Sequence, residues 1–136
     1  MSAEELLYPT IEDVHTMHED IITNDPKADG GVKNPGGVES ALLYVSVGYY
    51  NQVPETIHEK AAHLMRLLAA GHVFWDGNKR TALNATETFY DLNGYEFNHD
   101  DSGVRAILRE FATDESSVDM DAVVSYCESH ATKAEE

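Results

Sequence analysis

The run of nine residues from His72 to Arg80 separates two segments in which apolar residues recur at helical spacing. The segment before it begins at Pro54-Glu55, a proline-and-acid helix start, and ends at Gly71, a typical helix C-cap. The second segment extends from Asn78, within the run, to Leu92. This order predicts a helix, a loop and a second helix whose N-terminus faces the loop.

Four other segments show helical periodicity, so we predict an all-α bundle of about six helices, with the central loop between the third and the fourth. The additional helices are predicted over Thr10–Ile22, Glu39 to about Tyr50, Ser102–Phe111 and Ser117 to about Ser129. The second helix is expected to end near Gly48 or Asn51, and the last to be capped by Ser116 or Ser117.

The apolar stripes indicate the inward faces of the first four helices. The expected inward residues are Ile11, Val14, Met17, Ile21 and Ile22 in the first, Leu42, Leu43, Val45 and Val47 in the second, Ile57, Ala61, Leu64 and Leu68 in the third, and Ala82, Ala85, Phe89 and Tyr90 in the fourth. Residues 27–37 are predicted to form a long loop, Tyr95–Phe97 an extended piece and residues 131–136 a polar tail. Without a repeat or a composition shift, residues 1–136 are expected to form one domain.

The charge of the chain argues against a general nucleic-acid binder. Twenty-five Asp and Glu against nine Lys and Arg give a formal net charge of −16, whereas binding to phosphate backbones needs clustered cations. The acidic residues are dispersed along the chain, which is typical of a surface adapted to a salt-rich cytoplasm. The single cysteine, Cys127, excludes an internal disulfide and favours a reducing cytoplasm. Neither a signal peptide nor a membrane span is indicated.

The residues at the predicted start of the fourth helix are suited to phosphate. Unpaired backbone N–H groups at a helix N-terminus bind anions, and Gly77 lets the backbone approach one closely. Lys79 and Arg80 can neutralise phosphate oxygens, and Asn78 can orient an oxygen or an amide.

Two further residues of the run supply a base and a metal ligand. His72 titrates near neutrality and can accept the proton of an attacking hydroxyl. Asp76 is a hard oxygen ligand for Mg²⁺ carried by a nucleotide. Of Phe74 and Trp75, one is expected to enter the core and the other to line a cleft.

Structural roles compete with these functional ones. Asp76 could serve only as an N-cap, Gly77 as a turn, and Lys79 with Arg80 as a solvated first turn. His72 could likewise be only a charge at the C-terminus of the preceding helix. Elsewhere, Glu12, His15, His18 and Glu19 share a helical face, which suits either a metal ion or a solvated surface. Cys127 is expected to be a small core residue.

The residues His-x-Phe-x-Asp-Gly-Asn-Lys-Arg-Thr-Ala at positions 72–82 resemble the signature of the Fic/Doc family, most of all its Doc (death-on-curing) toxins. The resemblance extends upstream to the sequence Gly-Gly-Val-Lys-Asn-Pro-Gly at residues 30–36, and downstream through Thr81–Asn84 to Asn93-Gly94.

This resemblance implies a compact Fic fold that transfers part of ATP to a protein hydroxyl. It implies that His72 is the general base and that Asp76 binds Mg²⁺. The implied nucleotide-binding residues are Gly77, Asn78, Lys79, Arg80 and Asn84. The loop with Gly30, Gly31, Val32 and Lys33 corresponds to the flap that positions the target side chain.

Lys79 distinguishes two branches of the family. Fic enzymes that transfer AMP have Gly at this position, whereas Doc has Lys and is thought to transfer the γ-phosphate of ATP. Lys79 therefore favours a kinase acting on a Ser or Thr of a translation elongation factor. Gly77 is the Fic-like choice, where Doc carries Ala, so an AMP transferase stays as the alternative. A non-catalytic module that binds a nucleotide or a partner is a second alternative.

Many Fic proteins carry an inhibitory segment, Ser/Thr-x-x-x-Glu-Gly/Asn. The chain has no such segment, because Thr10, Thr16 and Ser125 are followed four residues later by Val, Asp and Ser. We therefore expect inhibition by a separate antitoxin that inserts a helix near the active site. The expected partners are thus an antitoxin and a protein substrate, with no nucleic acid and no membrane.

Overall fold

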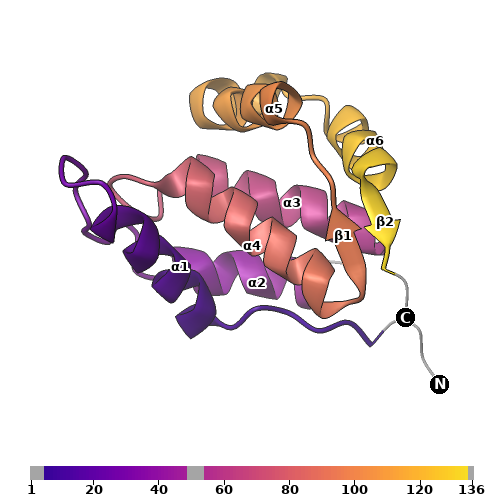
Figure 1. The fold of residues 1–136 in the computed structure, drawn as a ribbon, viewed down its shortest axis with the longest axis horizontal. Coiled ribbons are helices and arrows are strands. Elements are labelled where there is room, and N and C mark those ends of the chain that lie inside the picture. The colour runs from indigo at the N-terminus through magenta and orange to yellow at the C-terminus, as the bar shows by residue number, and fades with distance from the viewer. Residues whose placement is uncertain (1–4, 49–53, 135–136) are drawn as a thin grey trace.

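The computed structural model describes residues 5–48 and 54–134, which are mostly helical (Figure 1). The elements are α1 (Ile11–Thr23), α2 (Gly37–Ser46), α3 (Ile57–Ala70), α4 (Asn78–Leu92), β1 (Tyr95–Phe97), α5 (Asp101–Asp114), the 3-10 helix η1 (Glu115–Ser117), α6 (Met120–His130) and β2 (Ala131–Lys133). The predicted all-α architecture with six helices is confirmed for this part of the chain. None of these helices is long and apolar enough to cross a membrane.

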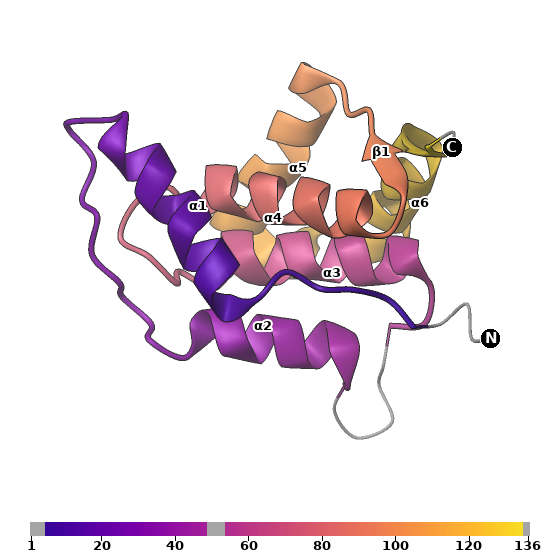
Figure 2. The ribbon, with the colours of Figure 1, turned by 60° about the horizontal axis from the view of Figure 1, so that its bottom comes forward.

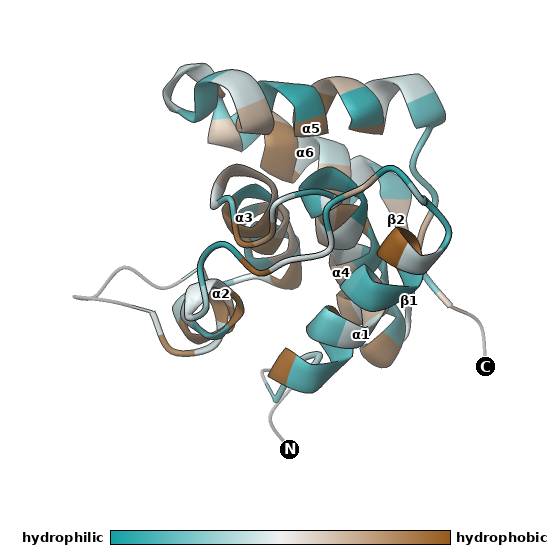
Figure 3. Ribbon diagram, turned by 90° about the vertical axis from the view of Figure 1, so that its left-hand side faces the viewer, coloured by the Kyte–Doolittle hydropathy of each residue, from teal (hydrophilic) through white to brown (hydrophobic). Residues whose placement is uncertain are grey.

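Helices α3 and α4 form the central layer. α1 and α2 cover one side of this pair, and α5 and α6 cover the other (Figures 1 and 2). α3 is buried on most of its surface, including Ala61, Leu64, Met65 and Leu68. The inward residues predicted for α4 are all buried. Figure 3 looks along this pair and shows α5 crossing over it.

Capping boxes fix where α1 and α3 begin. The Thr10 hydroxyl accepts from the amide of Asp13, and the Asp13 carboxylate accepts from the amide of Thr10, as expected for an N-cap at this residue. Thr56 and Glu59 make the same pair of bonds. α3 therefore begins two residues beyond the predicted Pro54-Glu55 start, because the N-cap is Thr56.

The start of α6 also differs from the prediction. Asp119 is its N-cap and accepts from the amide of Asp121 at 3.1 Å, whereas Ser116 and Ser117 belong to η1. Any of the three could have capped a helix by residue type, so only the packing of α6 selects the site. α5 extends beyond its predicted limits at both ends, with Asp100 as its N-cap.

α2 is shorter than predicted, and its inward face is different. It ends at Ser46, followed by Gly48 with a φ of +83°, while Tyr50 and Asn51 lie outside the described residues. Its buried residues are Val38, Ala41 and Val45, whereas the predicted inward residues Leu43 and Val47 are exposed. In α1, the prediction is wrong for Ile11, which is 43% exposed.

The predicted polar tail is partly a strand. β2 pairs antiparallel with β1, so that Tyr95 lies opposite Lys133 and Phe97 opposite Ala131. The extended piece at β1 was predicted, but β2 was not. A three-residue strand with a polar composition carries no period-two signal, and it forms here because β1 offers it backbone partners.

Candidate active site

The loop between α3 and α4 begins with a change of backbone direction at His72. Gly71 ends α3 and donates its amide to the carbonyl of Leu67 at 3.0 Å, and a Cβ on Gly71 would collide with that carbonyl oxygen. His72 follows with a φ of +49°, in the left-handed region that costs an L-residue about 1–2 kcal/mol. Contacts of the following residues must therefore hold the loop in place.

Phe74 anchors the loop in the core, where it is 1% exposed. Its amide donates to Oδ1 of Asn78 at 3.0 Å, and its carbonyl accepts from Nδ2 of Asn78 at 2.8 Å. The carboxamide of the first residue of α4 thus clamps the loop to the helix. Trp75 is 53% exposed, so the two aromatic residues have opposite orientations, as predicted.

A histidine of α1 supports the loop from the other side. The ring of His18 stacks on Phe74 with 3.6 Å between ring centroids and 9° between planes. Its Nε2 lies 2.8 Å from the carbonyl oxygen of Asp76, and it carries the proton because a carbonyl only accepts. Gly77 passes beside the same ring with a φ of +84°, and a Cβ there would lie 3.3 Å from Cδ2 of His18.

Sequence reasoning missed this role of His18. The residue was placed on a face that was either solvated or metal-binding, but its ring is buried. No group of three His, Cys, Asp or Glu residues suited to a metal ion occurs within residues 5–48 and 54–134. The available signal was the spacing from Val14, which puts His18 one turn further along the inward face.

The carboxylate of Asp76 is held by the upstream loop. Its Oδ2 accepts from the amide of Asp29 at 2.7 Å, and Oδ1 of Asp29 accepts from the amide of Gly31 at 3.0 Å. Oδ1 of Asp76 has no hydrogen-bond partner among the residues that the structure describes. Asp29 was treated only as part of a loop, and its role depends on a contact across 47 positions that no local pattern reveals.

The loop with Gly30, Gly31, Val32 and Lys33, which is expected to be the flap, lies against the loop between α3 and α4. Val32 forms an antiparallel bridge with Phe74, the amide of Lys33 donates to the carbonyl of Val73 at 2.8 Å, and the amide of Trp75 donates to the carbonyl of Gly31 at 3.0 Å.

Small residues make this close approach possible. A Cβ on Gly31 would lie 2.8 Å from Cδ1 of Trp75, and one on Gly37 would lie 2.7 Å from Cγ2 of Val73. The ammonium of Lys33 sits 4.9 Å from the centre of the Trp75 ring, which is a cation–π distance. The indole is therefore held by the loop while half of its surface stays exposed.

A cavity of about 280 Å³ brings most of the predicted site residues together. It is lined by Ala69, His72, Trp75, Asp76, Gly77, Asn78, Lys79, Arg80 and Ala112. Asn84 is not among the lining residues, since it lies further along α4.

The N-terminus of α4 opens toward this cavity. It has no side-chain cap and no acidic residue in its first turn, so its free N–H groups and the positive end of its dipole remain available to an anion. Arg80 makes an exposed ion pair with Asp25 at 3.3 Å, which a phosphate could replace.

Comparison with known proteins agrees with this architecture. The sequence model of the Fic/DOC family matches residues 8–90, which include the loop at residues 30–33 and the loop before α4. The chain belongs to the Fic/Doc family. The protein named Toxin Doc of Mycolicibacterium smegmatis is 32% identical over 123 residues, which cover 86% of this chain and 93% of that protein. The protein named Protein kinase doc of Escherichia phage P1 is 34% identical over 67 residues, covering 48% of this chain and 52% of that protein.

These relatives make the chain a Doc-like member of the family. The match to the family model ends at residue 90, before β1, α5 and α6. The predicted site residues therefore lie within the match to the family model, whereas α5, which adds Ala112 to the cavity, lies beyond it but within the longer match to Toxin Doc.

Proposed function

We propose that this Doc-like protein is a toxin that transfers the γ-phosphate of ATP to a Ser or Thr hydroxyl of a protein acceptor. The supporting observation is the cavity in which His72, Asp76 and Lys79 meet at the uncapped start of α4. Lys79 occupies the position that separates Doc from AMP-transferring Fic enzymes, and the phage relative is named a protein kinase.

In the proposed reaction His72 accepts the proton of the acceptor hydroxyl. The acceptor oxygen then bonds to the γ-phosphorus, the bond to the oxygen bridging the β- and γ-phosphates breaks, and ADP leaves with the bonding electrons. The N–H groups at the start of α4, including those of Asn78 and Lys79, face the phosphate oxygens on which charge develops. The Lys79 ammonium and the Arg80 guanidinium add positive charge beside them.

Asp76 is the residue that fits a Mg²⁺ ion brought by the nucleotide. The amide of Asp29 orients its carboxylate, and the second oxygen is left for a ligand. Such ions are usually held by one or two carboxylates together with the phosphates, so one carboxylate is sufficient. When bound, the ion supplies charge neutralisation at the phosphates.

The proposed acceptor is a translation elongation factor. The proposed regulator is an antitoxin that inserts a helix near the active site, and the proposed location of the protein is the cytoplasm. The relative named Toxin Doc supports the toxin role. The loop with exposed Val32, which lies against the loop that carries exposed Trp75, is the surface that we assign to positioning the acceptor hydroxyl. We also propose Asn84 as a nucleotide contact, which requires the nucleotide to extend beyond the cavity.

An AMP transferase is the second candidate, and Gly77 favours it. The left-handed φ of Gly77 and the nearby His18 ring favour glycine at this position. Glycine is the residue that Fic enzymes have here, whereas Doc has Ala. ATP labelled separately on the α- and γ-phosphate, incubated with purified elongation factor, distinguishes the two reactions. Label from the γ-position supports the kinase, and label from the α-position contradicts it.

The variant His72→Ala separates catalysis from mere binding. Removing the base should lower the transfer rate by about 10²–10⁴-fold while leaving ATP affinity nearly unchanged. If transfer survives at the parent rate, His72 is not the base. If neither label is transferred by the parent protein, the remaining alternative is a non-catalytic module that binds a nucleotide or a partner.

A further inference from the structure

A second cavity lies between α4 and α5 and gathers much of the positive charge of the chain. It measures about 440 Å³ and is lined by Lys79, Arg80, Leu83, Asp101, Val104, Arg105, Leu108 and Arg109. Four of its lining residues are cations, from a total of nine Lys and Arg in a chain of formal charge −16. We call this cavity the cationic cleft.

The cationic cleft combines charge with an apolar floor. Arg105 and Arg109 are one turn apart on α5, so both project on the same side of the helix. Val104 and Leu108 line the cavity as buried members of the core, and Leu83 contributes from α4. Such a surface fits a ligand that carries negative charges beside apolar groups.

The cations of the cleft remain available to a ligand. Among the residues that the structure describes, Arg105 pairs only with Asp101, at 3.5 Å, and both side chains are more than two thirds exposed. Exposed pairs of this kind are weak and are easily exchanged. The guanidinium of Arg109 has no ion pair or hydrogen bond among residues 5–48 and 54–134.

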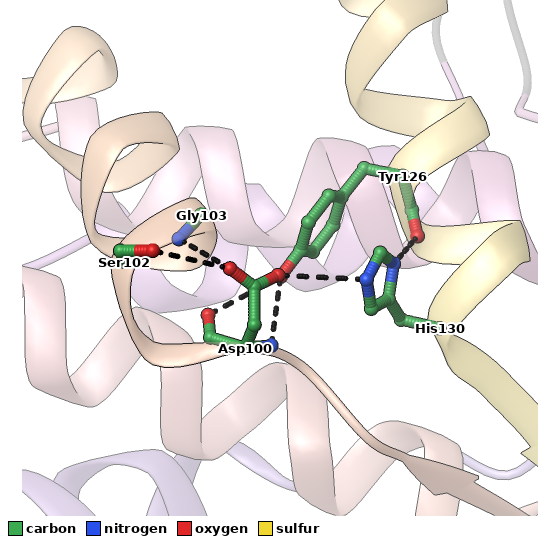
Figure 4. A network of polar contacts seen from close by, with 5 residues as sticks. All are labelled: Asp100, Ser102, Gly103, Tyr126 and His130. Carbon is green, nitrogen blue, oxygen red and sulfur yellow. Dashed lines mark hydrogen bonds and ion pairs between the residues drawn. The ribbon is translucent and has the colours of Figure 1, made fainter.

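The wall that carries these arginines is firmly attached. Asp100 caps α5 through the amide of Gly103 at 2.7 Å, and the Tyr126 hydroxyl of α6 donates to Oδ1 of Asp100 at 2.7 Å (Figure 4). The ring of His130 stacks on Tyr126 with 3.9 Å between centroids. This network holds the N-terminal end of α5 against α6, so the helix that carries the arginines is in place before a ligand binds.

The cationic cleft adjoins the cavity that contains His72. Lys79 and Arg80 line both cavities, and Ala112 of α5, one turn beyond Leu108, lines the His72 cavity. A chain that is seated on Arg105 and Arg109 can therefore continue toward the reacting atoms.

We propose that the cationic cleft docks an acidic segment of the acceptor protein, with Arg105 and Arg109 as its specificity-determining residues. This inference rests on the proposed transfer to a protein hydroxyl. Over most of its surface a chain of charge −16 repels an acidic protein, and the cleft reverses that sign beside the site. Local charge complementarity of this kind steers and orients a partner.

The acceptor is favoured as occupant because transfer already requires it beside His72. A segment that binds one cavity away holds the same molecule at a second point, which raises the effective concentration of its hydroxyl.

Binding of a synthetic probe tests the docking site directly. A fluorescein-labelled peptide with Glu and Leu at helical spacing is titrated with the full chain, and its anisotropy gives Kd. The double variant Arg105→Ala/Arg109→Ala should bind about tenfold or more weakly, since two charge contacts are lost. The control Lys27→Ala/Lys133→Ala removes the same charge from exposed residues outside the cleft and should leave Kd unchanged within about twofold.

Two further arms complete the test. Arg105→Lys/Arg109→Lys keeps the charge and should retain most of the affinity for the peptide. If the alanine variant loses affinity because its structure is disturbed, the lysine variant should not restore that affinity. Saturating ATP with Mg²⁺ should weaken the peptide only a few-fold, because Arg105 and Arg109 lie on another helix than the phosphate site. Equal losses in the two double alanine variants overturn the proposal, and so does complete displacement by ATP, which would assign the cleft to the nucleotide.

Failure of the docking site and failure of the proposed function give different results. Peptide binding needs no transfer, so His72→Ala should bind the peptide as the parent protein does. With the acceptor protein, Arg105→Ala/Arg109→Ala should raise KM for the acceptor about tenfold at unchanged kcat and unchanged KM for ATP. An unchanged KM for the acceptor overturns the docking proposal even where transfer itself is intact.

Discussion

Replacing Asn78 with alanine is expected to destabilise the loop before α4 rather than to remove a ligand contact. The Asn78 carboxamide makes hydrogen bonds of 3.0 and 2.8 Å with the backbone of Phe74, which is buried. Each such bond contributes about 1 kcal/mol net, and an unsatisfied buried partner costs about 1–3 kcal/mol. Because Asn78 itself is half-buried and water can reach part of the site, we expect a loss of about 2 kcal/mol.

Urea unfolding followed by circular dichroism measures this loss. For a chain of this length, about 2 kcal/mol corresponds to a decrease in Tm of roughly 7 °C. Asn84→Ala is the matched control, because Asn84 lies in the same helix, is also half-buried, and makes no side-chain hydrogen bond within the described residues. That variant should be neutral or slightly more stable, since alanine is the better helix former.

Affinity for ATP, measured alongside stability, decides between a clamp and a ligand contact. If Asn78→Ala unfolds at the urea concentration of the parent protein and yet loses affinity for ATP, the carboxamide acts on the nucleotide and is not a clamp of the loop. Asn78→Asp keeps an acceptor for the Phe74 amide but faces the Phe74 carbonyl with an oxygen. It should therefore destabilise the protein about as much as alanine does.

Three further changes have defined outcomes. Gly31→Ala should shift the fluorescence maximum of Trp75, the single tryptophan, because a Cβ there would lie 2.8 Å from the indole; Gly36→Ala, with nothing within 4 Å, should not. Burial raises the pKa of Cys127 to about 12, so a thiol reagent should fail to label the native protein at pH 8 and should label it in urea. The hydrogen bond from a tyrosine hydroxyl lowers the pKa of Asp100 below its ordinary 3.8, so its stabilising effect is present above pH 3.8 and lost as pH falls through the lowered value. The stabilities of Asp100→Asn and of the parent protein, measured by unfolding across pH, should therefore differ at pH 7 and converge in acid.

The central part of the fold could be predicted from the sequence because its signals are local. The apolar spacing of α4, with Gly77 before it and Asn93-Gly94 after it, gives limits that the structure reproduces. The opposite orientations of Phe74 and Trp75 follow from the alternation of an extended loop. The grouping of His72 with Lys79 in one cavity likewise follows from their separation by a short loop at a helix start.

Features that depend on distant partners were not accessible in this way. His18 is buried because Phe74 and the Asp76 carbonyl are there to receive its ring, although its spacing from Val14 already indicated an inward position. Asp29 and the strand β2 acquire their roles only from contacts across the fold. Within the site, the clamp formed by Asn78 was not predicted either. An asparagine carboxamide can form hydrogen bonds with a bound ligand or with the protein backbone, so the residue type alone does not distinguish the two roles.

Because Lys79 and Arg80 line both cavities, a nucleotide and an acidic segment cannot bind independently. Phosphates at the start of α4 neutralise two of the four cations that attract the segment, so each ligand should weaken the other. Thermodynamic reciprocity requires the two factors to be equal: the few-fold increase in peptide Kd caused by ATP must match the increase in ATP Kd caused by the peptide. An increase much larger than a few-fold would mean that one ligand moves α5, in which case the rigid wall inferred from the Asp100 network would be wrong.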